Sequence, residues 1–171
     1  MKLKSLLLAS ALCSISASAS AFAQMQLELS LKEITTGQYH RPYTAVWIEN
    51  SRGESVKTLA LWVQHDGHKW FKDIRRWWRK VGRDNPAMVD AVSSATRPAG
   101  QYHLDWDLSN DDGKPLAEGD YQLFIEVVRE HGGRELIRHP FSLPGDDFNV
   151  KLPATSETGE SQIHYSREAK R

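Results

Sequence analysis

Three hydroxyl-bearing side chains and one carboxylate lie close together in the segment from Asp90 to Thr96. The segment is too polar for a core strand and contains too few turn-forming residues for an ordinary loop. A threonine hydroxyl such as that of Thr96 can carry a covalent phosphate ester. Ser and Thr also cap helices by accepting backbone N–H bonds, so Ser93 or Ser94 could simply mark a helix start before a strand. The residues alone leave both interpretations open.

A second group that could do chemistry consists of His65 and His68, on either side of a turn at the end of a predicted strand. A metal site needs three or four ligands in a suitable geometry, so these two histidines favour a solvated turn over a metal site. The sequence contains no glycine-rich phosphate loop, no Gly-x-Ser-x-Gly motif and no paired-carboxylate spacing. A hydrolase therefore has no candidate residue to start from.

The chain before Asp90 is predicted to be helical. Aromatic and apolar residues recur at helical spacing from Lys69 to Lys80, with basic residues between them, which predicts a short amphipathic helix. Pro86 suits the first position of a second helix, because its missing N–H would be unpaired there in any case. This second helix is expected to end at Val92 and to lead directly into the hydroxyl-bearing segment.

Strands are predicted for most of the remaining chain. Alternation of apolar and polar side chains indicates strands over residues 26–34, 43–49, 56–63, 101–108, 119–128, 135–143 and 148–152. The second and third of these are separated by a short turn and are expected to pair as a hairpin. The last one is expected to lie at the edge of a sheet. The pattern predicts a mainly β protein with one or two short helices between strands.

The two ends of the chain differ from the rest. Lys2 and Lys4 precede a short apolar run, and residues 21–23 have the small-x-small form of a cleavage site, which predicts a secretory signal peptide over residues 1–23. Residues 24–152 are then predicted to form one sandwich domain. The polar tail, residues 153–171, shows little apolar periodicity and is predicted to be disordered.

Removal of the signal peptide changes the composition of the mature chain. Cys13 is the single cysteine and leaves with the signal, so thiol redox chemistry and disulfides are excluded. Lys2 and Lys4 also leave, which reduces the 22 basic residues to 20 against 22 acidic residues. No basic block remains, and nucleic acid is not expected as a partner.

The segment from Asp90 to Thr96 resembles the acceptor motif of bacterial proteins that carry covalent FMN. The matching residues are Asp90, Ser93, Ala95 and Thr96, and this chain has Ser94 where the motif usually has Gly. The resemblance implies that FAD:protein FMN transferase moves FMN from FAD onto Thr96 through a phosphoester bond. It also implies that Asp90 helps the transferase to recognise the segment, whose small residues let it enter the enzyme in extended form.

Two further resemblances concern the fold and the family. The run from Trp106 to Phe124 is similar to the C-terminal hairpin of immunoglobulin-like domains in flagellar-hook capping proteins, which implies an immunoglobulin-like β-sandwich. Together with Ala45–Glu49, Arg75–Trp78 and the acceptor segment, it resembles the predicted periplasmic proteins of domain-of-unknown-function family 2271. That family implies a periplasmic location and an FMN-acceptor motif. It also implies a PepSY-type membrane electron-transfer protein as a partner.

These observations predict a periplasmic flavoprotein that carries electrons, rather than an enzyme with a substrate of its own. Trp77 and Trp78 are candidates for a face on which the flavin stacks, although core packing is the favoured interpretation for each. Cations at Arg75, Arg76 or Arg79 are candidates for stabilising the reduced flavin.

The alternative function is an unmodified immunoglobulin-like module that binds or scaffolds partners. In one version of it, His65 and His68 handle a metal ion.

Overall fold

The computed structural model describes residues 23–35, 37–64 and 68–167, without the side chains of residues 68–70. The predicted signal peptide therefore lies outside the described residues, apart from Ala23. Within the described ranges, no helix is both long enough and apolar enough to span a membrane.

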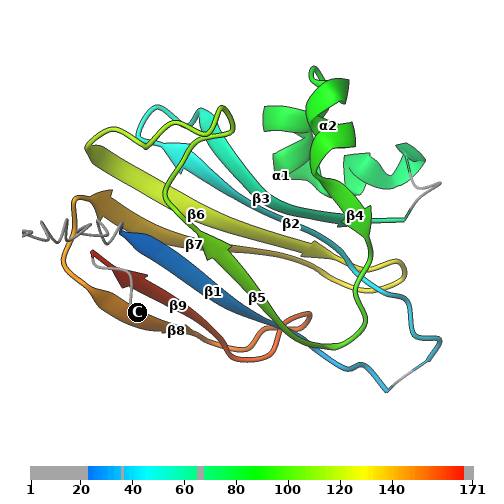
Figure 1. The fold of residues 1–171 in the computed structure, drawn as a ribbon. Helices are drawn as coiled ribbons and strands as arrows, with labels where there is room; N and C mark the ends of the chain where they lie inside the picture. Colours follow the sequence, from blue (N-terminus) through cyan, green and yellow to red (C-terminus); the bar gives the residue numbers. More distant parts are fainter. Residues whose placement is uncertain (1–22, 36, 65–67, 168–171) are drawn as a thin grey trace, which may run out of the picture.

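Two β-sheets face each other and form a sandwich (Figure 1). The four-stranded sheet contains, in spatial order, β5 (Gly100–Trp106), β1 (Gln24–Leu31), β9 (Ser161–Ser166) and β8 (Phe148–Leu152). The five-stranded sheet contains β4 (Ser93–Ala95), β3 (Ser55–Val63), β2 (Tyr43–Asn50), β6 (Gly119–Val128) and β7 (Arg134–Leu143). The predicted mainly β sandwich with short helices is confirmed, and its arrangement is compatible with the immunoglobulin-like class.

The main core fills the space between the two sheets. It takes alternate residues of every strand except β4, such as Leu27 and Leu29 of β1, because successive side chains of a strand point to opposite faces. Val46 and Ile48 of β2 reach the same core from the other sheet and are fully buried. The predicted pairing of β2 with β3 as an antiparallel hairpin is confirmed.

A second apolar cluster covers the outer face of the five-stranded sheet. Trp47 and Phe124 project to this face and stack with their ring centroids 4.9 Å apart. Trp77 from the helical layer packs into the same cluster and is 0% exposed. Both faces of β2 are therefore buried, which explains why its burial does not alternate, whereas the burial of β1 does.

The helical layer above this cluster is built from short pieces (Figure 1). They are the 3-10 helix η1 (His68–Asp73), the α-helical turn α1 (Arg75–Trp77), the π-helical turn η2 (Trp78–Gly82) and the helix α2 (Pro86–Val92). The predicted α2 is confirmed, with Pro86 in its first turn. The predicted continuous helix from Lys69 to Lys80 is wrong, because Ile74 has φ −78° and ψ 68° and interrupts it.

Gly82 permits the close packing at the end of this layer. A Cβ atom at this position would lie 2.6 Å from the ring of Trp78 and 2.7 Å from the ring of Trp77. Only glycine avoids this overlap, so the two tryptophans can fold back over the end of η2.

The predicted disordered tail is wrong for the part that the structure describes. Ser161–Ser166 forms β9, which pairs with β1 on one side and with β8 on the other. Ile163 and Tyr165 are 0% and 1% exposed and contribute to the main core. The sandwich domain therefore continues past residue 152, and β8 is an edge strand, as predicted, although it is not the last strand.

Candidate functional site

The acceptor segment begins in the last turn of α2 and continues past the end of this helix. Ser93 is the C-terminal cap of α2 and has extended backbone angles, φ −69° and ψ 138°. Its hydroxyl donates a hydrogen bond to the carbonyl oxygen of Val89. The N-terminal cap is Asn85, whose side chain accepts a hydrogen bond from the Met88 N–H at 3.0 Å. The interpretation of Ser93 or Ser94 as a cap at a helix start is therefore wrong, because the helix ends there.

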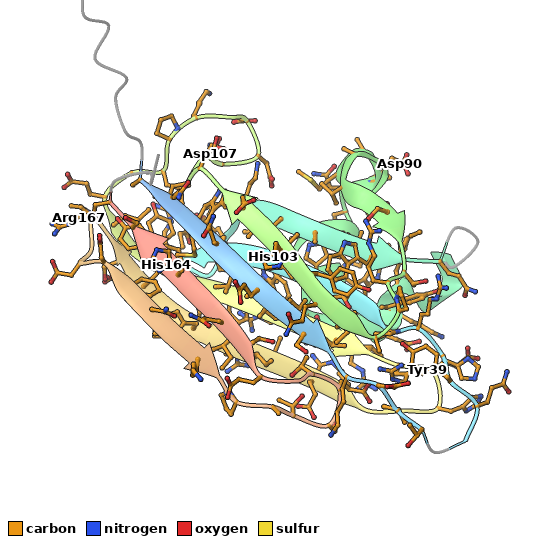
Figure 2. All side chains as sticks on the ribbon, turned by 60° about the horizontal axis from the view of Figure 1, so that its bottom comes forward. Tyr39, Asp90, His103, Asp107, His164 and Arg167 are labelled. Atoms are coloured by element: carbon orange, nitrogen blue, oxygen red, sulfur yellow. The ribbon has the colours of Figure 1, made fainter. Side chains whose placement is uncertain are left out.

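The five residues of the acceptor motif lie in one continuous and accessible stretch. Asp90 is exposed in the last turn of α2 (Figure 2), and Ser93, Ser94 and Ala95 are exposed in β4. The short strand β4 pairs in parallel with β3 at the edge of the five-stranded sheet. Ser93–Ala95 are thus extended at the open edge of the sheet, and Thr96 follows them.

Thr96 lies on the wall of a cavity of about 800 Å³. Three connections meet around it at one end of the sandwich: the β1–β2 loop, the β6–β7 turn and the β4–β5 connection, all on the right of Figure 1. The cavity is lined by Tyr39, His40, Arg41, Tyr43, Gln64, Asp73, Arg75, Thr96 and residues 128–134. The sequence motif and the large cavity therefore coincide at Thr96.

Two tyrosines give the cavity an aromatic wall. Tyr39 is 37% exposed on the β1–β2 loop (Figure 2), and its hydroxyl accepts a hydrogen bond from the Ala99 N–H at 2.7 Å. Tyr39 thereby ties this loop to the β4–β5 connection, three residues after Thr96. Tyr43 is half-buried, and burial raises the pKa of its hydroxyl, so the phenol stays protonated at neutral pH.

Arg129 lines the cavity and is 6% exposed, and its hydrogen bonds hold the surrounding loops. Its Nε donates to Glu157 Oε2 at 2.8 Å, and the carboxylate of Glu157 also accepts from the Gly133 N–H at 2.7 Å. The same guanidinium donates to the carbonyl oxygen of His40 and lies 5.0 Å from the centroid of the Tyr39 ring. The segment before β9 therefore holds the β1–β2 loop and the β6–β7 turn together.

A cluster of two imidazoles and one carboxylate stands on the cavity wall. His40 Nδ1 lies 3.2 Å from Glu130 Oε2, and His131 Nε2 lies 3.9 Å from Glu130 Oε1. The two imidazole rings meet edge to face, with their centroids 5.7 Å apart. Despite these three side chains, no group of His, Cys, Asp and Glu in the described ranges has an arrangement that could hold a metal ion.

The predicted flavin-contacting residues separate into two groups. Arg75 lines the cavity and is exposed. Arg79 does not line it, and its Nε donates to the carbonyl oxygen of Arg75 at 3.1 Å. Trp77 and Trp78 also lie away from the cavity: Trp77 is buried, and Trp78 stacks on Phe71 at 5.5 Å. Core packing, the favoured interpretation for both tryptophans, agrees with these positions.

Arg76 contacts buried residues of the five-stranded sheet below the helical layer. Its guanidinium donates to both oxygens of Glu49, at 3.1 and 2.5 Å, and stacks over Phe124 at 4.2 Å. The carboxylate of Glu126 accepts the backbone N–H bonds of Arg76 and Trp77, each at 3.0 Å to Oε2. Since Glu49 and Glu126 are 2% and 0% exposed, these charges are paired inside the protein and hold the first turn of α1.

The prediction that His65 and His68 handle a metal ion concerns atoms that the structure does not describe. His65 lies outside the described residues, and so does the side chain of His68. The two histidines on the cavity wall, His40 and His131, form no motif in the sequence. Their meeting depends on the antiparallel pairing of β2 with β6, which places Tyr43 opposite Val128 and brings the adjoining connections together.

The comparison with known families agrees with the family resemblance. Residues 24–160 match the family described as "predicted periplasmic protein (DUF2271)". No curated protein matches the chain. The family match covers most of the described sandwich, from β1 to the residue before β9. The chain therefore belongs to the DUF2271 family of predicted periplasmic proteins.

Proposed function

We propose that this protein is a periplasmic electron carrier with FMN attached through a phosphoester to Thr96. The observation that carries the proposal is the position of Thr96, which follows an exposed edge strand and lines a cavity of about 800 Å³. The motif resemblance supplies the hydroxyl acceptor, and the cavity supplies a place for the attached ring. An extracytoplasmic protein would lose a weakly bound cofactor, whereas a covalent bond retains it.

The cavity has the features that an isoalloxazine ring requires. Its volume lies within the range of about 300–1,000 Å³ that is usual for small-molecule sites. Tyr39 and Tyr43 offer aromatic surface, which contributes about 0.5–1.5 kcal/mol per offset ring contact beyond burial. Arg41 and Arg75 also line the cavity and offer positive charge to an anionic ligand. The residues present therefore fit FMN.

Each part of the chain has a definite role in this proposal. Bound FMN supplies the redox chemistry, and the protein sets its position and its electrostatic surroundings. Thr96 Oγ1 is the attachment atom, at a fixed point relative to the rigid sheet. Tyr39 orients the ring and restrains the β4–β5 connection through its bond from the Ala99 N–H. Arg75 stabilises negative charge at the cavity wall.

The proposal includes the partners and the location that follow from the family resemblance. A signal peptide over residues 1–23, cut after Ala23, exports the chain to the periplasm. FAD:protein FMN transferase then recognises Asp90 and the extended residues Ser93, Ser94 and Ala95. Electrons pass between a PepSY-type membrane protein and an acceptor by way of the attached FMN.

Co-expression with FAD:protein FMN transferase tests the attachment. We expect a fluorescent band for the wild-type protein on a denaturing gel under ultraviolet light, because a phosphoester survives denaturation. Thr96→Ala should abolish the band, whereas Thr35→Ala should keep it, since Thr35 is an exposed threonine outside the cavity wall. A dark wild-type band with an active transferase, or a fluorescent Thr96→Ala band, would contradict the proposal.

A further inference from the structure

We propose that His40, together with Glu130 and His131, takes up a proton when the flavin in the cavity is reduced, and so balances the charge that reduction brings there. This inference rests on the proposed attachment of FMN to Thr96. The observation behind it is that the three side chains form one cluster on the wall of the same cavity as Thr96.

The geometry of the cluster places a carboxylate beside the imidazole that receives the proton. His40 Nδ1 faces Glu130 Oε2 at 3.2 Å, a contact that becomes an ion pair when the imidazole is charged. Proton uptake by His40 therefore produces an imidazolium that the Glu130 carboxylate stabilises. The His40 side chain is 24% exposed, which leaves a path for a proton from water.

His40 is held in place from its backbone. Its carbonyl oxygen accepts a hydrogen bond from Arg129, whose guanidinium is fixed by Glu157. His131 packs against the His40 ring edge to face and approaches the other oxygen of Glu130 at 3.9 Å. The backbone of His40 is therefore anchored at the cavity wall, and its imidazole contacts His131 and Glu130.

The other ionisable groups around the cavity are Arg41, Tyr43, Asp73, Arg75, Arg129 and Arg134. Two of these arginines are already paired, Arg129 with Glu157 at 2.8 Å and Arg134 with Glu126 at 2.6 Å. The phenol of Tyr43 stays neutral because burial raises its pKa. Imidazole is the side chain whose charge ordinarily changes between about pH 5 and 8. The histidines are therefore the groups that take up the proton.

The step balances in atoms and charge. Two electrons from a reductant and one proton from water, added to the ring, leave one additional negative charge in the cavity. A second proton from water then forms an N–H bond at the unprotonated ring nitrogen of His40, and no bond of the protein breaks. The imidazolium offsets the new charge, so reduction consumes two protons per two electrons wherever His40 is neutral beforehand.

The midpoint potential of the loaded protein, measured against pH by spectroelectrochemistry with dithionite as reductant, tests this uptake. Intact mass first establishes one FMN per chain in each variant. For a two-electron couple, each proton taken up lowers the potential by about 30 mV per pH unit. We expect a slope of about 60 mV per pH unit in the wild type over the range in which His40 is neutral in the oxidised protein and charged in the reduced protein. His40→Gln should reduce the slope to about 30 mV over the same range.

Two further variants sharpen the result. Glu130→Gln should move the steep range to lower pH, because the carboxylate that stabilises the imidazolium is gone. His103→Gln is the matched control: this imidazole lies on the outer face of the four-stranded sheet (Figure 2), with its Nδ1 3.8 Å from Glu28 Oε1. The midpoint potential of the His103→Gln protein should follow the wild-type curve at every pH.

A readout without flavin separates a direct role from a structural one. In the unloaded Thr96→Val protein, NMR titration of the imidazole signals should show that Glu130→Gln lowers the midpoint of His40 and leaves that of His103 unchanged. Equal slopes of midpoint potential against pH for the loaded wild type and His40→Gln would overturn the inference. A His40 titration midpoint that Glu130→Gln leaves unchanged would overturn it as well. A wild-type chain that gains no FMN would contradict the proposed function instead, and intact mass reports that outcome separately.

Discussion

Glu157 and Arg129 form an ion pair in which both side chains are almost completely buried, 2% and 4% exposed, with Nε 2.8 Å from Oε2. Glu157 belongs to the segment before β9, and Arg129 follows β6. The same arginine donates to the backbone of the β1–β2 loop at His40 and Lys32. The pair therefore couples the C-terminal part of the domain to the wall of the cavity that contains Thr96.

Glu157→Ala should destabilise the protein strongly, because it leaves the Arg129 charge buried without its partner. Loss of one member of a buried ion pair costs about 3–5 kcal/mol. The free energy of unfolding in urea, measured by circular dichroism, gives the size of the effect. Glu160→Ala is the control, since Glu160 pairs with Lys151 at the surface and such pairs contribute about 1 kcal/mol or less. Equal losses in the two variants would show that the buried pair has no special role.

A second buried carboxylate, Glu126, holds the helical layer on the sheet. Glu126→Ala removes the acceptor of the Arg76 and Trp77 N–H groups and the partner of Arg134, so we expect a loss of about 3 kcal/mol in unfolding free energy. The near-ultraviolet circular dichroism of the tryptophans should weaken at the same time. Glu118→Ala, at an exposed position, should stay within about 0.5 kcal/mol of the wild type. An unchanged tryptophan signal in Glu126→Ala would contradict this role.

Local sequence patterns predicted the strands well where alternation and turns agree. The hairpin of β2 and β3 is an example, since both strands have strong β-formers and the turn contains Gly53, at φ +73°. The helix predicted between Lys69 and Lys80 failed for a different reason. A carboxylate from a distant strand, Glu126, binds the backbone at Arg76 and Trp77 and starts a new helical turn there, which no local pattern reveals.

The tail and the cavity show the same limit of local reasoning. In β9 the residues Gln162 and His164 alternate with Ile163 and Tyr165, but the strand is short and its polar surroundings favour disorder as a prediction. Its central place depends on pairing with β1, far away in the sequence. The acceptor motif could be identified from the sequence because it is local, whereas the cavity next to Thr96 forms only when distant connections meet.

His139 makes stability depend on pH. It is half-buried in β7, with its ring 5.4 Å from that of Phe148, and desolvation lowers the pKa of its imidazole. The unfolded chain, with an ordinary value of about 6.5, therefore binds the proton more readily than the folded chain. Stability that is present above about pH 6.5 should be lost as the pH falls towards the lowered pKa of the folded state.

His139→Gln removes this titration and should lose less stability than the wild type between about pH 8 and 5.5. Urea unfolding of both proteins at each pH measures the difference, and the comparison at the higher pH corrects for any change in packing. The same loss on acidification in both proteins would rule out a contribution from His139.

The central claim is that Thr96 carries FMN, and intact-mass spectrometry of the exported protein from its own host tests it most directly. We predict a mature chain heavier by one FMN phosphoester, with fragmentation placing the added mass on Thr96. We predict the bare-chain mass for Thr96→Val from the same cells. A wild-type protein with the bare-chain mass, in cells that contain an active FMN transferase, would contradict the account.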